Sequence, residues 1–396
     1  MKNPNDPKKS IAVLIGNGAS IAYSKNLLIP RITSEIVTRL DCAGNVDDPA
    51  AQLMQEIAQR LRVNNAAENF EALVGPFDEI SDVTRMMDRL AGLAGDRALS
   101  IQDALRQSSA FALDLRRYAV SHILEVIARE STARYDDSRM NPLLKFVRAT
   151  VDASGGGEVS YGNLNYDALL MAALCQEHDG LLCDMTDGRF TGQNIEVVPG
   201  YAMDGRRLRT VGNLPPNRRL SLIHLHGSLT WLHDTVSGEY RRFPIDSLRS
   251  SGYWEAWREG ETTWEPIVVL TNQNTKTSLV EDYPFRLTYE VFYSRLVTAD
   301  RWIIAGTSLQ DACVNEMLQR AWRDRGTVPQ VLVVTHGDGP TENEILNAVG
   351  WDPVWNSDPA PTKWLGVHRD GLESAPDSFE WLWWSLSEPV ERPKAA

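Results

Sequence analysis

The sequence predicts an α/β fold, a doubly wound parallel sheet with a helical insertion. Two observations carry this prediction. Short continuous apolar runs bounded by turn residues alternate along the chain with stretches of helical spacing, which is typical of buried parallel strands joined by helices. This alternation is broken over residues 46–150, where apolar residues recur at helical spacing with few strand-like runs. That segment is therefore expected to be the insertion.

Six runs have the apolar character expected of strands. The four clearest are Ile11–Ile15, Ile267–Leu270, Trp302–Ala305 and Val331–Val334. Two weaker ones are Glu158–Tyr161 and Leu220–Leu225. Because most of them are separated by helical patterns, we expect a Rossmann-like parallel sheet.

The same patterns divide the chain into three parts. Residues 1–45 and 151–350 are expected to form the sheet domain, 46–150 a helical insertion or subdomain, and 351–396 a Trp-rich C-terminal segment. Within the sheet domain, 197–265 is rich in Arg, Gly, Pro and Trp and predicts extended loops and an antiparallel hairpin. Six of the 12 tryptophans lie between Trp351 and Trp384. Two interpretations stay open for them: an interface core, or packing of this segment on its own domain.

Composition excludes several classes of function. The net charge of -13 argues against nucleic-acid binding and against an anionic membrane, since both would repel the chain. No run approaches the roughly 20 apolar residues of a membrane helix, and Ile11–Ile15 is too short for a signal core. The four cysteines are scattered and include no Cys-x-x-Cys pair. We therefore expect a cytoplasmic protein.

A glycine turn follows the first predicted strand. Gly16-Asn17-Gly18-Ala19-Ser20 leads from that strand into a predicted helix, a place where backbone N–H groups and the helix dipole favour a pyrophosphate. A standard dinucleotide fingerprint would have a third glycine where this chain has Ile21. The alternative is a tight turn between a buried strand and its helix.

Polar residues follow three further predicted strands. Asn165 and Asp167 come after the strand near 158–161, and His226 follows Leu220–Leu225. The turn Gly306-Thr307-Ser308 follows Trp302–Ala305. Open α/β sheets hold ligands at the carboxyl ends of their strands. The alternatives are helix caps for Asp167 and for Thr307 or Ser308, and a structural or metal-binding role for His226 with His224.

Together and in this order, these segments resemble the sirtuin family. Gly16-Asn17-Gly18-Ala19-Ser20 resembles its Gly-Ala-Gly-x-Ser loop, and Asn165-Tyr166-Asp167 its Gln-Asn-x-Asp motif with Leu164 in place of the glutamine. His226-Gly227 matches its His-Gly pair, and Gly306-Thr307-Ser308 its Gly-Thr-Ser turn. The segments "NFEALV" and "EDYPF" further resemble the bacterial sirtuin-like branch.

One departure narrows what the resemblance implies. Protein deacylases of this family carry a four-cysteine zinc module after the His-Gly pair, whereas this chain has no cysteine between His226 and Gly306. No zinc is therefore expected. The resemblance implies the branch that hydrolyses NAD to nicotinamide and ADP-ribose, whose members act in bacterial anti-phage defence. A sensor or assembly subunit that binds NAD or ADP-ribose is the alternative, and a protein deacylase is a third.

The resemblance also assigns roles and partners. Gly16, Asn17, Gly18, Ala19 and Ser20 would hold NAD, with Gly306, Thr307 and Ser308 on the other side of the cleft. Asn165 would orient water or the ribose hydroxyls, Asp167 would bind the nicotinamide amide, and His226 would accept a proton. By analogy with stand-alone sirtuin-like proteins, a homo-oligomer or a HerA-type ATPase partner is expected.

Overall fold

The fold was taken from a computed structural model, which describes residues 8–42, 52, 56, 71–93, 99–132, 136–187, 194–270, 273–354 and 358–392. A seven-stranded sheet with the order β14-β13-β11-β1-β2-β7-β3 forms its centre, and every strand pair in it is parallel. Its strands are β1 (Ile11–Ile15), β2 (Val159–Asn163), β3 (Leu182–Cys183), β7 (Leu220–His224), β11 (Arg301–Ala305), β13 (Gln330–Val334) and β14 (Leu365–His368). The predicted fold class is confirmed.

Five of the six predicted strands lie in this sheet, at β1, β2, β7, β11 and β13. The sixth, Ile267–Leu270, does not belong to it. That run overlaps β10 (Trp264–Val268), which pairs antiparallel with β8 in a separate sheet. A continuous apolar run indicates a buried strand but not the direction of its partner, so the sequence could not separate the two cases. The edge strands β3 and β14 were not predicted.

The smaller sheets come mainly from the segment predicted to hold extended loops and a hairpin. A four-stranded antiparallel sheet has the order β10-β8-β9-β6, and β4 pairs with β5 as a hairpin. β12 and β15 form a short ribbon near the C-terminus. The bounds are β4 (Asn194–Val198), β5 (Tyr201–Asp204), β6 (Arg206–Arg207), β8 (Gly227–Asp234), β9 (Tyr240–Arg242), β12 (Thr327–Val328) and β15 (Val390–Glu391).

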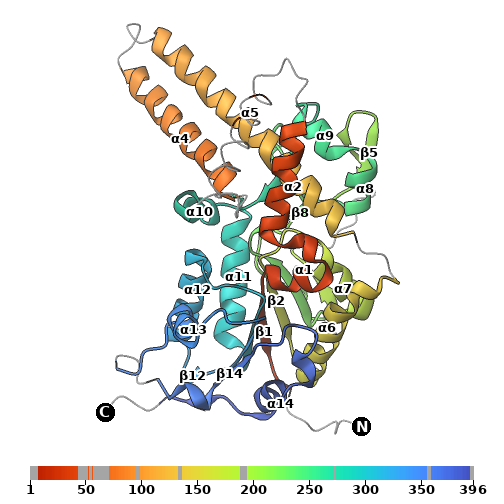
Figure 1. The fold of residues 1–396 in the computed structure, drawn as a ribbon, viewed down its shortest axis with the longest axis vertical. Helices are drawn as coiled ribbons and strands as arrows, with labels where there is room; N and C mark the ends of the chain where they lie inside the picture. Colours follow the sequence, from red (N-terminus) through yellow and green to blue (C-terminus); the bar gives the residue numbers. More distant parts are fainter. Residues whose placement is uncertain are drawn as a thin grey trace.

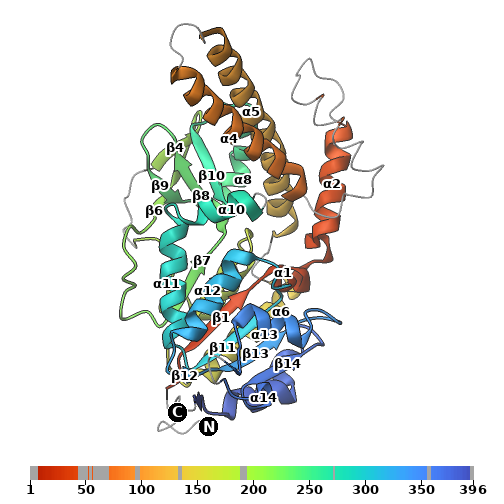
Figure 2. The ribbon, with the colours of Figure 1, turned by 90° about the vertical axis from the view of Figure 1, so that its left-hand side faces the viewer.

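Helices cover both faces of the parallel sheet (Figures 1 and 2). In the described ranges, none is long and apolar enough to span a membrane. Their bounds are α1 (Asn17–Tyr23), α2 (Ile29–Cys42), α4 (Glu71–Leu93), α5 (Leu99–Glu130), α6 (Asn141–Ala153), α7 (Leu169–His178), α8 (Ile245–Ser250), α9 (Tyr253–Arg258), α10 (Gln273–Val280), α11 (Phe285–Thr298), α12 (Ala312–Arg323), α13 (Glu342–Val349) and α14 (Phe379–Leu386).

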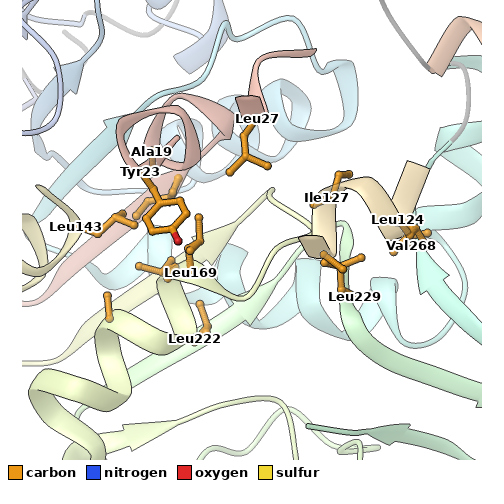
Figure 3. Close-up of a cluster of buried hydrophobic side chains, with 14 of the residues drawn as sticks. Ala19, Tyr23, Leu27, Leu124, Ile127, Leu143, Leu169, Leu222, Leu229 and Val268 are labelled. Atoms are coloured by element: carbon orange, nitrogen blue, oxygen red, sulfur yellow. The ribbon is translucent and has the colours of Figure 1, made fainter. Parts of the chain in front are cut away.

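Alternating side chains of the strands feed two cores, one on each face of the sheet. In β1, Ile11, Val13 and Ile15 point into one core, whereas Ala12 and Leu14 point into the other, as the two-residue period of a strand requires. The first core includes side chains of α1, α5 and α7, several of which are drawn in Figure 3. The second is built on α11, α12 and α13. β1, which leads into the glycine turn, is thus packed on both of its faces.

Helices α4 and α5 form an antiparallel hairpin that extends away from the sheet (Figures 1 and 2). The C-terminal half of α5 is buried in the first core, at positions such as Ile123 and Ile127. The distal part is different, because α4 carries a row of exposed apolar side chains. We call this row the α4 stripe: Ile80, Val83, Met86, Met87, Leu90 and Leu93.

Three of the C-terminal tryptophans that the structure describes pack against the rest of the chain. Trp364, Trp381 and Trp384 are buried, and the Trp384 indole N–H lies 3.1 Å from the carbonyl oxygens of both Trp302 and Gln330. Of the two interpretations left open for this segment, the described residues support packing on the sheet rather than an interface core.

Candidate active site

The predicted ligand segments meet at the switch point of the parallel sheet. β1 lies between β2 and β11, and the chain continues from β1 to β2 on one side and later to β11 on the other. Loops that leave neighbouring strands in opposite directions open a crevice at their carboxyl ends, which is where such sheets bind ligands. A cavity of about 910 Å³ lies there.

Nine predicted site residues line this cavity: Gly16, Asn17, Gly18, Asn165, Asp167, His226, Gly306, Thr307 and Ser308. They come from the carboxyl ends of β1, β2, β7 and β11. The other two, Ala19 and Ser20, are buried behind the lining. The structure therefore brings together segments that lie far apart in the sequence.

The two glycine turns contact each other backbone to backbone. The Gly18 N–H donates to the Gly306 carbonyl at 2.7 Å, and the Gly16 N–H donates to the Ala305 carbonyl at 2.9 Å. A Cβ atom on Gly18 would lie 2.6 Å from the Gly306 Cα. The space beside Gly18 is thus occupied by the Gly306 backbone, and the amides of Gly16 and Gly18 already have protein partners.

Asn165 connects the end of β2 to the first glycine turn. Its Nδ2 donates to the Gly16 carbonyl at 3.0 Å and lies 2.8 Å from the Ser20 Oγ. The Ser20 hydroxyl donates in turn to Asp167 Oδ2 at 2.5 Å. All these side chains are buried. This network fixes the amide of Asn165 at the cavity wall and gives Ser20 a positioning role.

Asp167 combines a helix cap with a place in the cavity wall. Its Oδ1 accepts the N–H of Leu169, the first residue of α7, at 2.9 Å, although Asp167 stands one residue before the N-cap position, which is Ala168. Burial raises the pKa of the Asp167 carboxyl, and the hydrogen bonds from Ser20 and Leu169 oppose that rise.

His226 lies in the two-residue connection between β7 and β8. The following Gly227 has a φ of 79°, and a Cβ there would lie 1.9 Å from the Ile267 carbonyl oxygen. Only glycine fits this position, which explains why the His-Gly pair occurs as a unit. The His226 carbonyl also accepts the Val269 N–H at 2.9 Å. His226 is 6% exposed and lines the cavity at the carboxyl end of β7.

The His226 Nε2 is surrounded by polar groups that the sequence did not identify. It lies 3.2 Å from Asp311 Oδ2 and 3.4 Å from the Tyr289 hydroxyl. Burial lowers the pKa of His226, whereas the hydrogen bond with Asp311 raises it and the charge of Lys276 lowers it. The neutral imidazole needed by a general base is therefore favoured. Asp311 stands at a helix N-cap, a position where the sequence alone indicates only capping.

The sequence also did not identify the residues that line the cavity opposite His226 and Asn165. It is lined by residues that follow β13 and β14 and by one residue of α13: Thr335, His336, Gly339, Pro340, Glu344, Asp370, Gly371, Leu372 and Glu373. The rule that placed Asn165 and His226 at strand ends applies equally to Thr335 and His336, directly after Val331–Val334. The sequence thus contained a signal for Thr335 and His336. It contained no such signal for the residues after β14, because β14 was not predicted.

The metal interpretation of His224 and His226 gains no support from the described ranges, in which no group of three or more His, Cys, Asp or Glu side chains could hold an ion. His224 lies apart from the cavity lining and contacts Asn163, with 3.3 Å between its Nδ1 and the amide Nδ2. Burial lowers the pKa of His224 to about 4. It is a neutral core histidine.

One family of known proteins matches part of this chain. Residues 160–354 match the SIR2-like domain family. The SIR2-like region contains Asn165, His226 and Gly306, and ends short of β14. It supports the predicted resemblance to sirtuin-like proteins, which use NAD. The glycine turn at Gly16–Ser20 lies outside it.

Among curated proteins we found no match. A solved chain described as "Structural Basis for the Mechanism and Regulation of Sir2 Enzymes" is 16% identical, and the alignment covers 57% of this chain and 69% of that chain with a TM-score of 0.30.

Proposed function

We propose that this protein is an NAD hydrolase that cleaves the nicotinamide–ribose bond, giving nicotinamide and ADP-ribose. The observation that carries the proposal is the convergence of His226, Asn165 and both glycine turns on one cavity at the sheet's switch point. The SIR2-like region supports the use of NAD, and the choice of hydrolysis rests on the resemblance to the zinc-less branch.

The proposed chemistry assigns each part of the cavity a task. Breaking the bond to the cationic nicotinamide builds positive charge on the ribose, as in glycoside cleavage. The turns at Gly16–Gly18 and Gly306–Ser308 would form the two walls against which the pyrophosphate and the adjoining ribose lie, since the amides of Gly16 and Gly18 are already hydrogen-bonded to Ala305 and Gly306. Asn165 would orient a ribose hydroxyl or the attacking water, and Asp167 the carboxamide of nicotinamide. His226 would accept the proton released when water adds.

The lining of the cavity argues against the deacylase alternative. An acyl-lysine cleft in this chain would be built from residues 197–265. Of that segment, only His226 lines the cavity. The cavity is instead bounded by apolar side chains of the N-terminal helices and α5, at Ile21, Ile32 and Ile127. Such a surface shelters one small substrate from water and offers little edge backbone to a peptide.

One observation favours a second candidate, a binding subunit that senses NAD or ADP-ribose. In this structure the polar atoms of the proposed catalytic groups already have protein partners: Asn165 contacts Ser20, and His226 contacts Asp311. A chain in this state could hold a nucleotide without turning it over. The two candidates therefore share a cavity and differ in whether the bound nucleotide is cleaved.

The first prediction separates them. Incubation of the purified chain with NAD is expected to yield nicotinamide and ADP-ribose in equal amounts, measured by liquid chromatography. A binding subunit would raise the melting temperature in NAD without producing either compound. The assay is run with and without candidate activators such as phage lysate, because defence hydrolases stay silent until triggered. Thermal stabilisation without product under both conditions would contradict the hydrolase.

The proposal includes an anti-phage role and an assembly. The defence role and a HerA-type ATPase partner are carried by resemblance alone. A homo-oligomer has support in the α4 stripe, in which Ile80, Val83, Met87 and Leu90 have the three- and four-residue spacing of a coiled-coil seam. A seam of this kind fits a helix with the same stripe, so we take its partner to be α4 of a second copy.

The second prediction tests that contact. Replacing Val83 and Leu90 with glutamate is expected to shift the chain from oligomer to monomer in size-exclusion chromatography with light scattering. The monomer should stay folded, because these side chains are 51% and 58% exposed. Gln107→Glu, at an exposed position of α5 outside the stripe, is a control for an added charge. A parent chain that is already monomeric at micromolar concentration would contradict the seam.

A further inference from the structure

A buried ion pair lies behind His226 and has no part in the function described so far. Lys276, on α10, is 3% exposed, and its Nζ lies 2.6 Å from Asp311 Oδ2. The same carboxylate oxygen is 3.2 Å from the His226 Nε2. Removing two charges from water is costly, and the Coulomb attraction of one pair does not reliably offset that cost. A pair retained at this position calls for a reason other than stability.

The loop that presents Asp311 is held in an unusual conformation. Leu309 has a φ of 57°, in the left-handed region that a residue with a branched side chain rarely adopts. Its N–H donates to the Thr307 hydroxyl at 3.2 Å, and its carbonyl accepts from the Asn315 amide at 2.8 Å. Asp311 Oδ1 caps α12 through the Val314 N–H. Strain fixed in this way is typical of functional sites.

We propose that Asp311 is a positioning residue for His226 and that Lys276 is its counter-charge, an inference that rests on the proposed role of His226. Asp311 orients the imidazole and stabilises its protonated form. Lys276 limits that stabilisation, so that the ring returns its proton. The same loop carries Gly306–Ser308, and it therefore couples the nucleotide turn to the proton acceptor.

The two charges act on His226 in opposite senses, and this makes the proposal testable. Besides Asp311 and Lys276, the described groups facing this cluster are the Tyr289 and Tyr166 hydroxyls, the backbone of Leu164 and the Cys313 thiol. Burial raises the pKa of Tyr289 well above its ordinary value, so it stays neutral, and burial also raises the pKa of Cys313. Among the described residues, the charges that act on the His226 ring are those of Asp311 and Lys276.

The experiment follows the titration of His226 by NMR in full-length protein with labelled histidine, its signal assigned by its loss in His226→Gln. Asp311→Asn removes a negative charge beside the ring and is expected to lower the titration midpoint of His226. Lys276→Met removes a positive charge and is expected to raise it, each by at least about 0.5 pH unit. The pH at which nicotinamide release is half maximal should move in the same directions. Asp311→Asn should also reduce kcat roughly 10- to 100-fold with little change in KM.

Two further variants serve as controls. The double variant Asp311→Asn/Lys276→Met removes both buried charges together and should fold even if a single variant does not, with an intermediate midpoint. Asp246→Asn, whose side chain is 89% exposed, should leave the midpoint and the kinetics unchanged.

The possible outcomes separate a failure of this inference from a failure of the proposed function. Midpoints that move in the same direction, or not at all, in the two single variants overturn the inference whether or not NAD is cleaved. Opposite midpoint shifts in a chain that never releases nicotinamide support the control of His226 by this pair, and it is then the proposed hydrolase function that fails.

Discussion

Replacing His226 with alanine is expected to reduce nicotinamide release by about 100-fold or more, the range that a general base contributes. Two histidines line the described part of the cavity: His226 at the carboxyl end of β7, and His336 on the opposite part of the lining. Histidine is the side chain whose ordinary pKa lies near neutral pH, which suits a general base. The fold should survive, because Asp311 keeps Lys276 as its partner. Product release is measured over time, with circular dichroism as the test of folding.

His178→Ala is the matched control, since His178 ends α7 and does not line the cavity. It should retain the parent's rate. If folded His226→Ala released nicotinamide as fast as the parent, the assignment of His226 would be wrong. A loss of turnover in both variants would indicate a general sensitivity of the chain and would equally remove the argument for His226.

Five strands of the central sheet, β1, β2, β7, β11 and β13, could be predicted because each is buried on both faces. Such strands appear in the sequence as unbroken apolar runs, as in Ile11–Ile15 and Val331–Val334. Ile267–Leu270 gives the same signal from an antiparallel sheet, and nothing local distinguishes the two. β14 gives a weaker signal, since Leu365 and Val367 are only half-buried at the edge of the sheet. Pairing direction and edge position are set by tertiary contacts that a single sequence does not display.

The site was predictable to the extent that topology dictates it. Parallel strands place all their carboxyl ends on one edge of the sheet, so polar residues after β1, β2, β7 and β11 had to lie near one another. Residues that act through another residue were not predictable. Lys276 lies on α10, which does not follow a strand of the parallel sheet, so the strand-end rule does not apply to it. Asp311 has the sequence signature of an ordinary N-cap. Their proximity to His226 follows only from packing.

The contact between the two glycine turns was not expected from the sequence. Gly18 was expected to help hold NAD, and in the structure the atoms that occupy the space beside it belong to Gly306. Glycine is needed here so that two backbones can touch, which fixes the spacing of the two walls of the cavity. Binding of a pyrophosphate would then depend on this spacing.

That dependence gives the final prediction. Gly306→Ala is expected to lower the free energy of unfolding by about 3 kcal/mol or more and to abolish NAD-induced thermal stabilisation. Its φ is 65°, and its new Cβ would lie 2.6 Å from the Ala19 nitrogen and 2.8 Å from the Gly18 Cα, both backbone atoms that cannot rotate away. Gly200→Ala is the matched control, with a φ of 75° and no atom within 4 Å. It carries only the left-handed penalty of about 1–2 kcal/mol. Urea unfolding of both variants, with and without NAD, separates backbone strain from contact between the turns. Equal losses of stability in the two variants, with NAD binding retained in Gly306→Ala, would show that the turns do not set the width of the cavity.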